Sequence, residues 1–158
     1  MDMQVQEEIC CPPFDPKPWT NTFVTLDDKQ FIKEKVRTFF FMPINFGGVM
    51  KRVVSKVERA GGTVVDNMVL SDHQSKWRMD VYIAVDREIP GCEQTHLSGT
   101  FLSQVYEGPF SDTAIWTKDF ERLAKEKGLE IKRWFMWYTT CPKCAKKYGK
   151  NYVVILGS

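Results

Sequence analysis

The sequence predicts an α+β protein in which two strand–helix–strand–strand modules lie side by side in one antiparallel sheet. Two segments, 49–60 and 115–124, show the 3.6-residue apolar period of an amphipathic helix. Shorter segments around them have the composition of strands and are bounded by Gly and Pro. Because this pattern occurs twice, we expect both helices on one face of the sheet, with a ligand cleft between the modules.

The composition excludes several classes of protein. The chain has 158 residues, 43% of them hydrophobic, and a net charge of +2 from 22 basic and 20 acidic side chains. It therefore lacks the basic excess of a nucleic-acid-binding protein, and its apolar runs are too short to cross a bilayer. Residues 1–8 are polar and acidic, unlike a signal peptide, so we expect a cytoplasmic protein that contacts neither nucleic acid directly nor a membrane.

The first module is expected at about 31–90. Its predicted elements are a strand from Phe23, a turn at Asp27–Asp28, a strand over Phe31–Met42, the first helix, and strands over Thr63–Leu70 and Trp77–Val85. The first helix should end at Gly61–Gly62, because glycine readily adopts the left-handed conformation that closes a helix. The polar residues from Ser71 to Lys76 predict a hairpin loop between the last two strands.

The second module is expected at about 95–158. Its predicted elements are a strand over Leu97–Glu107, a helix capped by Ser111 or Asp112, a strand over Ile131–Thr139 and a last strand over Tyr152–Leu156. Gly128 should end the helix, and Gly108–Pro109 should end the strand before it. Together the modules form one domain over 23–158. Residues 1–22 form an irregular arm, and Phe14 and Trp19 indicate that this arm lies over a surface.

Two motifs resemble a known family. The sequence Val105-Tyr106-Glu107-Gly108-Pro109-Phe110, followed by a helix and Gly128, resembles a strand–turn–helix segment of the gyrase-inhibitory-protein-like (GyrI-like) family. Residues 79–85 resemble the closing strand of one of its modules. The resemblance covers about 39–156. Two segments that contain cysteine, 10–15 and 141–144, resemble additions in a bacterial branch of the family that is labelled hydrolase. The resemblance implies paired modules with a small-molecule cleft between them. Members of the family bind drugs, inhibit gyrase or hydrolyse cyclopropane-bearing toxins.

The chain departs from this family in two respects. Family members usually have a carboxylate at the start of the last strand, whereas this chain has Lys150-Asn151-Tyr152 there. The first module keeps a carboxylate, at Asp80. Regulators of the family also have a helix-turn-helix before the modules, and the 22 irregular residues here cannot form one, so we do not expect a stand-alone transcription factor.

Glu107 and Asp80 are the predicted catalytic residues. A carboxylate in an apolar cleft can protonate a strained ring or activate a water molecule. Glu107 is the first choice, because it is the last residue of a strand that ends at Gly108–Pro109, and it is expected to face the cleft. Surface positions for both residues remain the alternative, since carboxylates are usually exposed.

Aromatic residues make up 13% of the chain and are the predicted walls of a ligand site. Such walls favour a small aromatic or cationic molecule. The alternation of a strand places Trp134 and Trp137 on opposite faces, so about half of the aromatic residues should instead fill the core. The predicted ligand-binding residues are Trp77, Tyr82, Tyr106, Phe110, Trp116, Trp137 and Tyr152.

Two cysteine pairs suggest a zinc site. Cys141 and Cys144 form a C-x-x-C turn, and Cys10 and Cys11 could complete four ligands. A redox-active or disulfide-bonded pair, or cysteines that only pack, remain alternatives.

These observations lead to two hypotheses about function. The first is a small-molecule-binding protein, extending to a hydrolase of strained or electrophilic compounds, that requires no cofactor and is a monomer or weak dimer. The second is a non-enzymatic interaction or redox protein organised by zinc or thiols.

Overall fold

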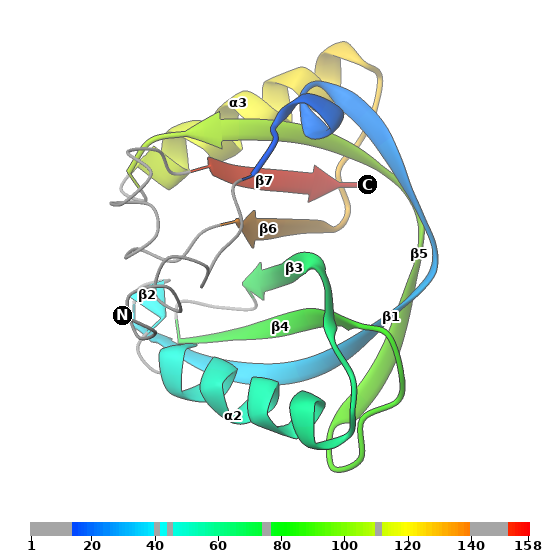
Figure 1. Ribbon diagram of the computed structural model, residues 1–158. Helices are drawn as coiled ribbons and strands as arrows, with labels where there is room; N and C mark the ends of the chain where they lie inside the picture. Colours follow the sequence, from blue (N-terminus) through cyan, green and yellow to red (C-terminus); the bar gives the residue numbers. More distant parts are fainter. Residues whose placement is uncertain (1–13, 40–41, 44–45, 74–76, 110–111, 140–151) are drawn as a thin grey trace, which may run out of the picture. The chain divides into compact units, whose positions relative to one another are not determined.

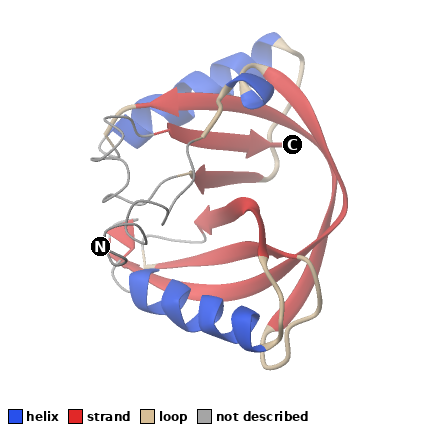
Figure 2. Cartoon of the chain, in the orientation of Figure 1, coloured by secondary structure: helices blue, strands red, loops and turns tan. Residues whose placement is uncertain are grey.

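The computed structural model describes residues 14–39, 42–43, 46–73, 77–109, 112–139 and 152–158. Strands predominate, and the described residues form two α-helices, so the α+β class is confirmed (Figures 1 and 2). The elements, in chain order, are η1 (Lys17–Trp19), β1 (Thr22–Phe39), β2 (Met42–Pro43), α2 (Phe46–Arg59), β3 (Val64–His73), β4 (Arg78–Val85), β5 (Glu93–Glu107), α3 (Thr113–Glu126), β6 (Trp134–Tyr138) and β7 (Tyr152–Gly157).

The chain divides into two compact units. Unit 2 is Thr25–Gly99, and unit 1 consists of Met1–Val24 and Thr100–Ser158. Strands β1 and β5 therefore each contribute residues to both units. The strand order is β2-β1-β4-β3 in unit 2 and β6-β7-β5 in unit 1, with antiparallel pairings. Neither described helix is long and apolar enough to cross a membrane.

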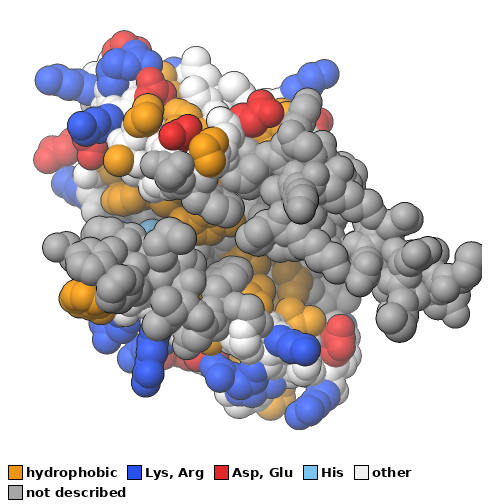
Figure 3. All heavy atoms as spheres, turned by 90° about the vertical axis from the view of Figure 1, so that its left-hand side faces the viewer, with side chains coloured by type: hydrophobic (Ala, Val, Ile, Leu, Met, Phe, Trp, Pro, Cys, Tyr) orange, Lys and Arg blue, Asp and Glu red, His pale blue; other side chains and the backbone are white. Residues whose placement is uncertain are grey.

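In unit 2, helix α2 packs on one face of the sheet because its apolar residues recur with the helical period. Val49, Val53 and Val57 are buried and form a core with β1 and β4 residues such as Ile32 and Ile83. Lys and Arg side chains cover the outer surface near α2 (Figure 3). The helix ends as predicted: Gly61 has φ +73°, and the N–H of Gly62 donates to the carbonyl of Val57 at 2.9 Å.

In unit 1, helix α3 packs on the sheet in the same manner. Trp116, Phe120 and Leu123 are buried against Leu102 of β5 and residues of β6 and β7. Gly128 has φ +73°, and the helix ends there as predicted. Asp112 occupies the N-cap position of α3, one of the two predicted positions, but its side chain makes no capping hydrogen bond. Ser111, the other predicted position, lies outside the described residues.

Several predicted boundaries differ from the structure, and two of the differences change which residues are strand and which are turn. Asp27–Asp28 does not separate two strands, because β1 continues through it. Asp28 takes φ +49° inside the strand, and its N–H donates to the Ser98 hydroxyl oxygen at 2.8 Å. The predicted loop from Ser71 is strand as far as His73, because β3 stays paired with β4 up to His73 and Met79.

Candidate functional site

The first candidate site lies in unit 2, on the sheet face away from α2. Met79, Val81 and Ile83 of β4 belong to the α2-side core, so the alternate residues Asp80 and Tyr82 point to the other face. Lys33 of β1 is the direct partner of Tyr82 and brings its ammonium group to this face. Two of the predicted residues in unit 2, Asp80 and Tyr82, are therefore on one face of the sheet.

Asp80 is buried, and its two carboxylate oxygens have different surroundings. The side chain is 9% exposed. Oδ2 lies 3.7 Å from Lys33 Nζ, whereas Oδ1 is buried and has no hydrogen-bond partner among the described residues. A buried carboxylate oxygen without a partner costs free energy, and a catalytic role or a bound water molecule is among the explanations for such an atom. Asp80 is therefore a candidate functional group.

Lys33 connects Asp80 to a second acidic residue. Its Nζ lies 3.9 Å from Oε2 of Glu93 at the start of β5, and 5.8 Å from the centre of the Tyr82 ring. The Tyr82 ring packs edge-on against Phe31, with ring centres 6.4 Å apart. Lys33 is 32% exposed, whereas Tyr82 is buried. The ammonium group thus lies between the buried carboxylate of Asp80 and solvent.

The second candidate site lies in unit 1, on the sheet face away from α3. Tyr106 contributes to the α3-side core, so its neighbour Glu107 points to the opposite face. There Glu107 is the direct cross-strand partner of Tyr152, and Val154 of the same strand is the partner of Trp137. Glu107 is exposed, while Trp137 is buried.

The arm contributes two further aromatic residues to this second site. Trp19 and Phe14 contact Trp137 edge-on with ring centres 5.0 and 5.4 Å apart, and Phe14 also lies 5.9 Å from Tyr152. The Ser103 hydroxyl donates to the Trp19 carbonyl at 2.7 Å and holds this part of the arm on β5. The prediction that Phe14 and Trp19 lie over a surface is confirmed, and Trp137 is covered by the chain itself.

Tyr106 and Trp116 are on the α3 side of unit 1, away from Glu107. Their rings stack with centres 6.0 Å apart, and Trp116 is buried in the core. Trp116 was predicted to bind a ligand, but it packs in the core on the α3 side of the sheet and not beside Glu107. The reason is that its position on α3 falls in the apolar stripe that covers the sheet.

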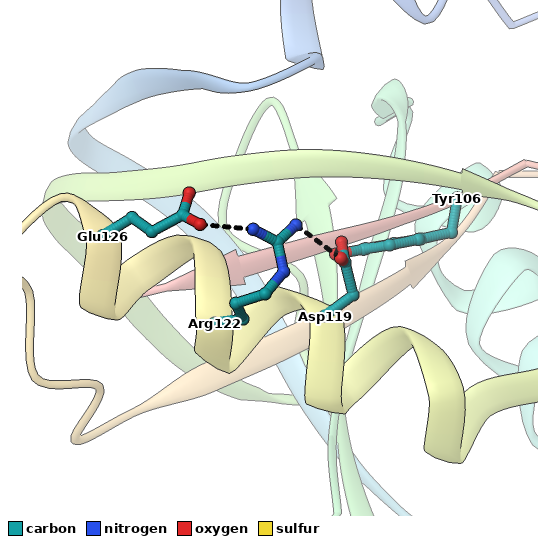
Figure 4. A network of polar contacts seen from close by, with 4 residues as sticks. All are labelled: Tyr106, Asp119, Arg122 and Glu126. Carbon is teal, nitrogen blue, oxygen red and sulfur yellow. Dashed lines mark hydrogen bonds and ion pairs between the residues drawn. The ribbon is translucent and has the colours of Figure 1, made fainter.

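Tyr106 also begins a polar network that joins β5 to α3 (Figure 4). Its hydroxyl donates to Oδ2 of Asp119 at 2.7 Å, and Arg122 donates to Oδ1 of Asp119 at 2.7 Å and to Glu126 at 2.5 Å. Burial and then the bond to Asp119 raise the pKa of Tyr106 above its ordinary range. Arg122, with a smaller contribution from Tyr106, lowers the pKa of Asp119. This network fixes the strand that ends at Glu107.

The remaining predicted residues either belong to neither of the two candidate sites or fall outside the described residues. Trp77 is 54% exposed just before β4. Trp134 and Trp137 face opposite sides of the sheet, as predicted, and Trp134 is partly exposed. Among the residues that the structure describes, no group of His, Cys, Asp and Glu side chains could hold a metal ion. The predictions for Phe110, Cys10, Cys11, Cys141 and Cys144 fall outside these residues.

Two acidic residues at the first site, Asp72 and Glu93, were not predicted. Asp72 of β3 is the direct cross-strand partner of Asp80 and lies on the same face of the sheet. The sequence suggested a solvated loop at this position. The register that brings Asp72 and Asp80 together is the information that a single sequence lacks.

These features define the class of the protein: a mixed α/β protein with a buried carboxylate in one unit and an aromatic cluster in the other. A family model described as bacterial hydrolase matches residues 1–158. The chain therefore belongs to this bacterial hydrolase family. No curated protein matches the chain.

Proposed function

We propose that this protein hydrolyses small electrophilic compounds and that Asp80 supplies the catalytic carboxylate. Membership of the bacterial hydrolase family supports hydrolysis as the type of reaction. The observation that carries the choice of residue is the buried Oδ1 atom of Asp80, which has no hydrogen-bond partner among the described residues. A water molecule or the substrate would satisfy this atom.

The surroundings of Asp80 suit a general base. Lys33 lies 3.7 Å from Oδ2, which leaves Oδ1 as the oxygen that would accept a proton from the attacking water. Little solvent reaches the side chain, so its interactions with a reacting group are stronger than in water. The ring of Tyr82 lies on the same face, where it is buried against Phe31.

Glu107 is the second candidate for the catalytic residue. Glu107 has an aromatic neighbour that could contact a ligand, because Tyr152 is its direct cross-strand partner. Its exposure argues against it, because an exposed carboxylate is solvated and reacts as it would in water. We therefore propose Asp80 before Glu107, in contrast to the order expected from the sequence.

Several finer features of the function stay predictions. They include the resemblance to the gyrase-inhibitory-protein-like family, the side-by-side arrangement of the two modules with a ligand cleft, and a small aromatic or cationic ligand. The same holds for the monomeric or weakly dimeric state, the cytoplasmic location and catalysis without a required cofactor. The alternative of a zinc- or thiol-organised interaction or redox protein depends on cysteines outside the described residues.

The proposal is tested by measuring hydrolysis of two probes, styrene oxide and 4-nitrophenyl acetate. Asp80→Asn should lower kcat/KM for both by about 100-fold or more, the loss expected when a general base is removed. Glu107→Gln should stay within a few-fold of the unmodified protein, and Asp27→Asn, on an exposed part of β1, is the matched control. A large loss in Glu107→Gln with none in Asp80→Asn would transfer the role to Glu107. No hydrolysis of either probe by the unmodified protein would refute the proposed function.

A further inference from the structure

We propose that Lys33 is a second catalytic residue, whose ammonium group stabilises the negative charge that develops on a substrate oxygen when Asp80 acts as the general base. This inference rests on the proposed function and narrows its substrate class. The substrates would be esters, lactones and strained cyclic ethers, because hydrolysis of these compounds places negative charge on an oxygen atom.

The first step of the argument is the position of the ammonium group. Lys33 and Asp80 share the face of the unit 2 sheet away from α2, and Nζ of Lys33 lies 3.7 Å from Oδ2 of Asp80. The side chain of Lys33 is 32% exposed, whereas that of Asp80 is 9% exposed. A molecule that reaches Asp80 from solvent can therefore contact the ammonium group as well.

The second step is that the hydrogen-bond donors of the Lys33 side chain are uncommitted. A charge-assisted hydrogen bond from nitrogen to a carboxylate oxygen is about 2.7–2.9 Å long. The distances from Nζ to Oδ2 of Asp80 and to Oε2 of Glu93 are 3.7 and 3.9 Å, which are too long for such a bond. Within the described part of the chain, the ammonium group of Lys33 therefore donates no hydrogen bond, although it has three N–H groups.

The third step is that several weaker contacts hold the ammonium group in place. Nζ lies 5.8 Å from the centre of the Tyr82 ring, within the range of a cation–π interaction, and Tyr82 is the direct cross-strand partner of Lys33. The carboxylates of Asp80 and Glu93 also attract the ammonium group. The positive charge is thus positioned before a substrate binds, and its N–H groups remain available to the substrate.

A second lysine on β1 does not share these features. Lys35 is the direct cross-strand partner of Asp80, but its side chain is exposed. Among the residues that the structure describes, the cation that forms an ion pair with Asp80 is Lys33 and not Lys35. A comparison of the two lysines therefore separates the effect of a positioned ammonium group from that of positive charge nearby.

The reaction needs such a group and balances with water as the only co-reactant. For an ester, the water oxygen forms a bond to the carbonyl carbon, Asp80 takes one proton from the water, and one electron pair of the C=O bond moves to the oxygen that Lys33 contacts. The C=O bond re-forms as the bond to the leaving oxygen breaks, and the proton on Asp80 passes to that oxygen, which leaves an acid and an alcohol. A preorganised donor directed at the transient negative charge stabilises the transition state.

The test replaces the oxygen that Lys33 would contact by sulfur, which accepts hydrogen bonds only weakly. The probes are 4-nitrophenyl acetate and its thiono analogue, which has sulfur in place of the carbonyl oxygen and the same leaving group. Lys33→Met should lower kcat/KM for the ester by about 100-fold and that for the thiono analogue by less than about threefold. Asp80→Asn should lower both alike, because a general base acts on the water and not on the carbonyl oxygen.

Two further lysine variants complete the comparison. Lys35→Met should lower neither activity by more than about threefold, because its ammonium group is not held beside Asp80. Lys51→Met, at an exposed position of α2, is the matched control. An oxygen-specific loss in Lys35→Met as large as that in Lys33→Met would overturn the assignment to Lys33.

Each outcome decides between the two proposals. Equal loss of both activities in Lys33→Met would mean that Lys33 acts through Asp80 or through the fold, and loss of neither would mean that it takes no part. Either result would overturn the catalytic role of Lys33 and leave the proposed function standing. If the unmodified protein hydrolyses styrene oxide but not the ester, the same comparison is made between styrene oxide and styrene sulfide. No hydrolysis of any probe would refute the proposed function, and the role of Lys33 with it.

A second variant keeps the test decisive if circular dichroism shows that Lys33→Met does not fold. Lys33→Gln removes the positive charge but keeps an N–H donor beside Asp80. It should lower the ester activity by at least about tenfold and the thiono activity by less than about threefold. Equal changes in both activities would overturn the role of Lys33.

Discussion

Gly157 of β7 provides a sharp test of how α3 packs on the sheet. A Cβ atom at this position would lie 2.7 Å from Cε2 and 3.0 Å from Cζ of Phe120, and 3.0 Å from Cδ1 of Ile131. Phe120 is buried, so its ring has little room to move. Gly157→Ala should therefore behave as an overpacking substitution and lower the free energy of unfolding by about 1–3 kcal/mol.

The expected change is large enough to measure by thermal and urea denaturation. For a chain of this size, 1 kcal/mol corresponds to about 2–4 °C in Tm, so Gly157→Ala should lower Tm by about 2–12 °C. Gly48→Ala is the matched control, because nothing lies within 4 Å of a Cβ at Gly48 in α2. The same change there should raise the free energy of unfolding by up to about 1 kcal/mol through helix propensity.

A double variant identifies the side chain responsible. If the ring of Phe120 is the obstacle, Phe120→Leu should cost less in the Gly157→Ala background than alone, with a coupling of about 0.5–3 kcal/mol. An unchanged Tm in Gly157→Ala, or purely additive effects in the double variant, would show that α3 does not pack on β7 as described.

Three further predictions follow from other features. Val57→Asp should lower the free energy of unfolding by several kcal/mol, because it places an unpaired charge at a position that is 1% exposed in the α2 core; an equally stable variant in urea would refute this packing. The pKa of Asp119 in the folded protein lies below the reference value of 3.8, chiefly because Arg122 donates a hydrogen bond to it. The ionised side chain therefore stabilises the folded state above about pH 4, and this stabilisation is lost as the pH falls through the folded pKa. Asp119→Asn should therefore flatten the loss of stability between pH 4 and 2, and an unchanged pH profile of Tm would contradict this. If zinc joins the two cysteine pairs, chelation should loosen the arm before the core unfolds, and elemental analysis without zinc would remove the site formed by Cys10, Cys11, Cys141 and Cys144.

The helices were predictable because their signals are local. In α2 the apolar period and the glycines at 61 and 62 are both contained in the segment itself, and the structure confirms both. By contrast, Asp27–Asp28 has the composition of a turn, and its true conformation depends on a hydrogen bond to Ser98, which is distant in sequence. Local preference is overridden where a distant partner satisfies the backbone.

The candidate sites were only partly predictable, for the same physical reason. Alternation along β6 correctly separated Trp134 from Trp137, because side-chain direction in a strand has a period of two. Which residues meet across strands depends on register, so the Asp72–Asp80 pair was not predicted. The contact of Trp116 with Tyr106 depends on how α3 packs on the sheet, and it was not predicted either. The sequence also did not predict how exposed the two carboxylates are. Asp80 is buried and Glu107 is exposed, and this difference is the reason for proposing Asp80 before Glu107.

A last prediction separates function from stability at Asp80 and Lys33. Replacing a buried ion pair by apolar residues of similar size is often neutral or stabilising by about 1–4 kcal/mol. The double variant Lys33→Met, Asp80→Leu should therefore be at least as stable as the unmodified protein and should lose hydrolysis of both probes. Lys33→Met alone should be the least stable of the set, because it leaves a carboxylate that is 9% exposed without its cation.

The single variant Asp80→Leu should be close to neutral in stability, because Lys33 is 32% exposed and retains Glu93 at 3.9 Å. The three stabilities are compared by urea denaturation at pH 7, with Lys51→Met, an exposed position of α2, as the control. A double variant that is much less stable than the unmodified protein would mean that the ion pair holds unit 2 together. In that case burial of Asp80 would no longer favour catalysis, because a requirement of the fold would explain it.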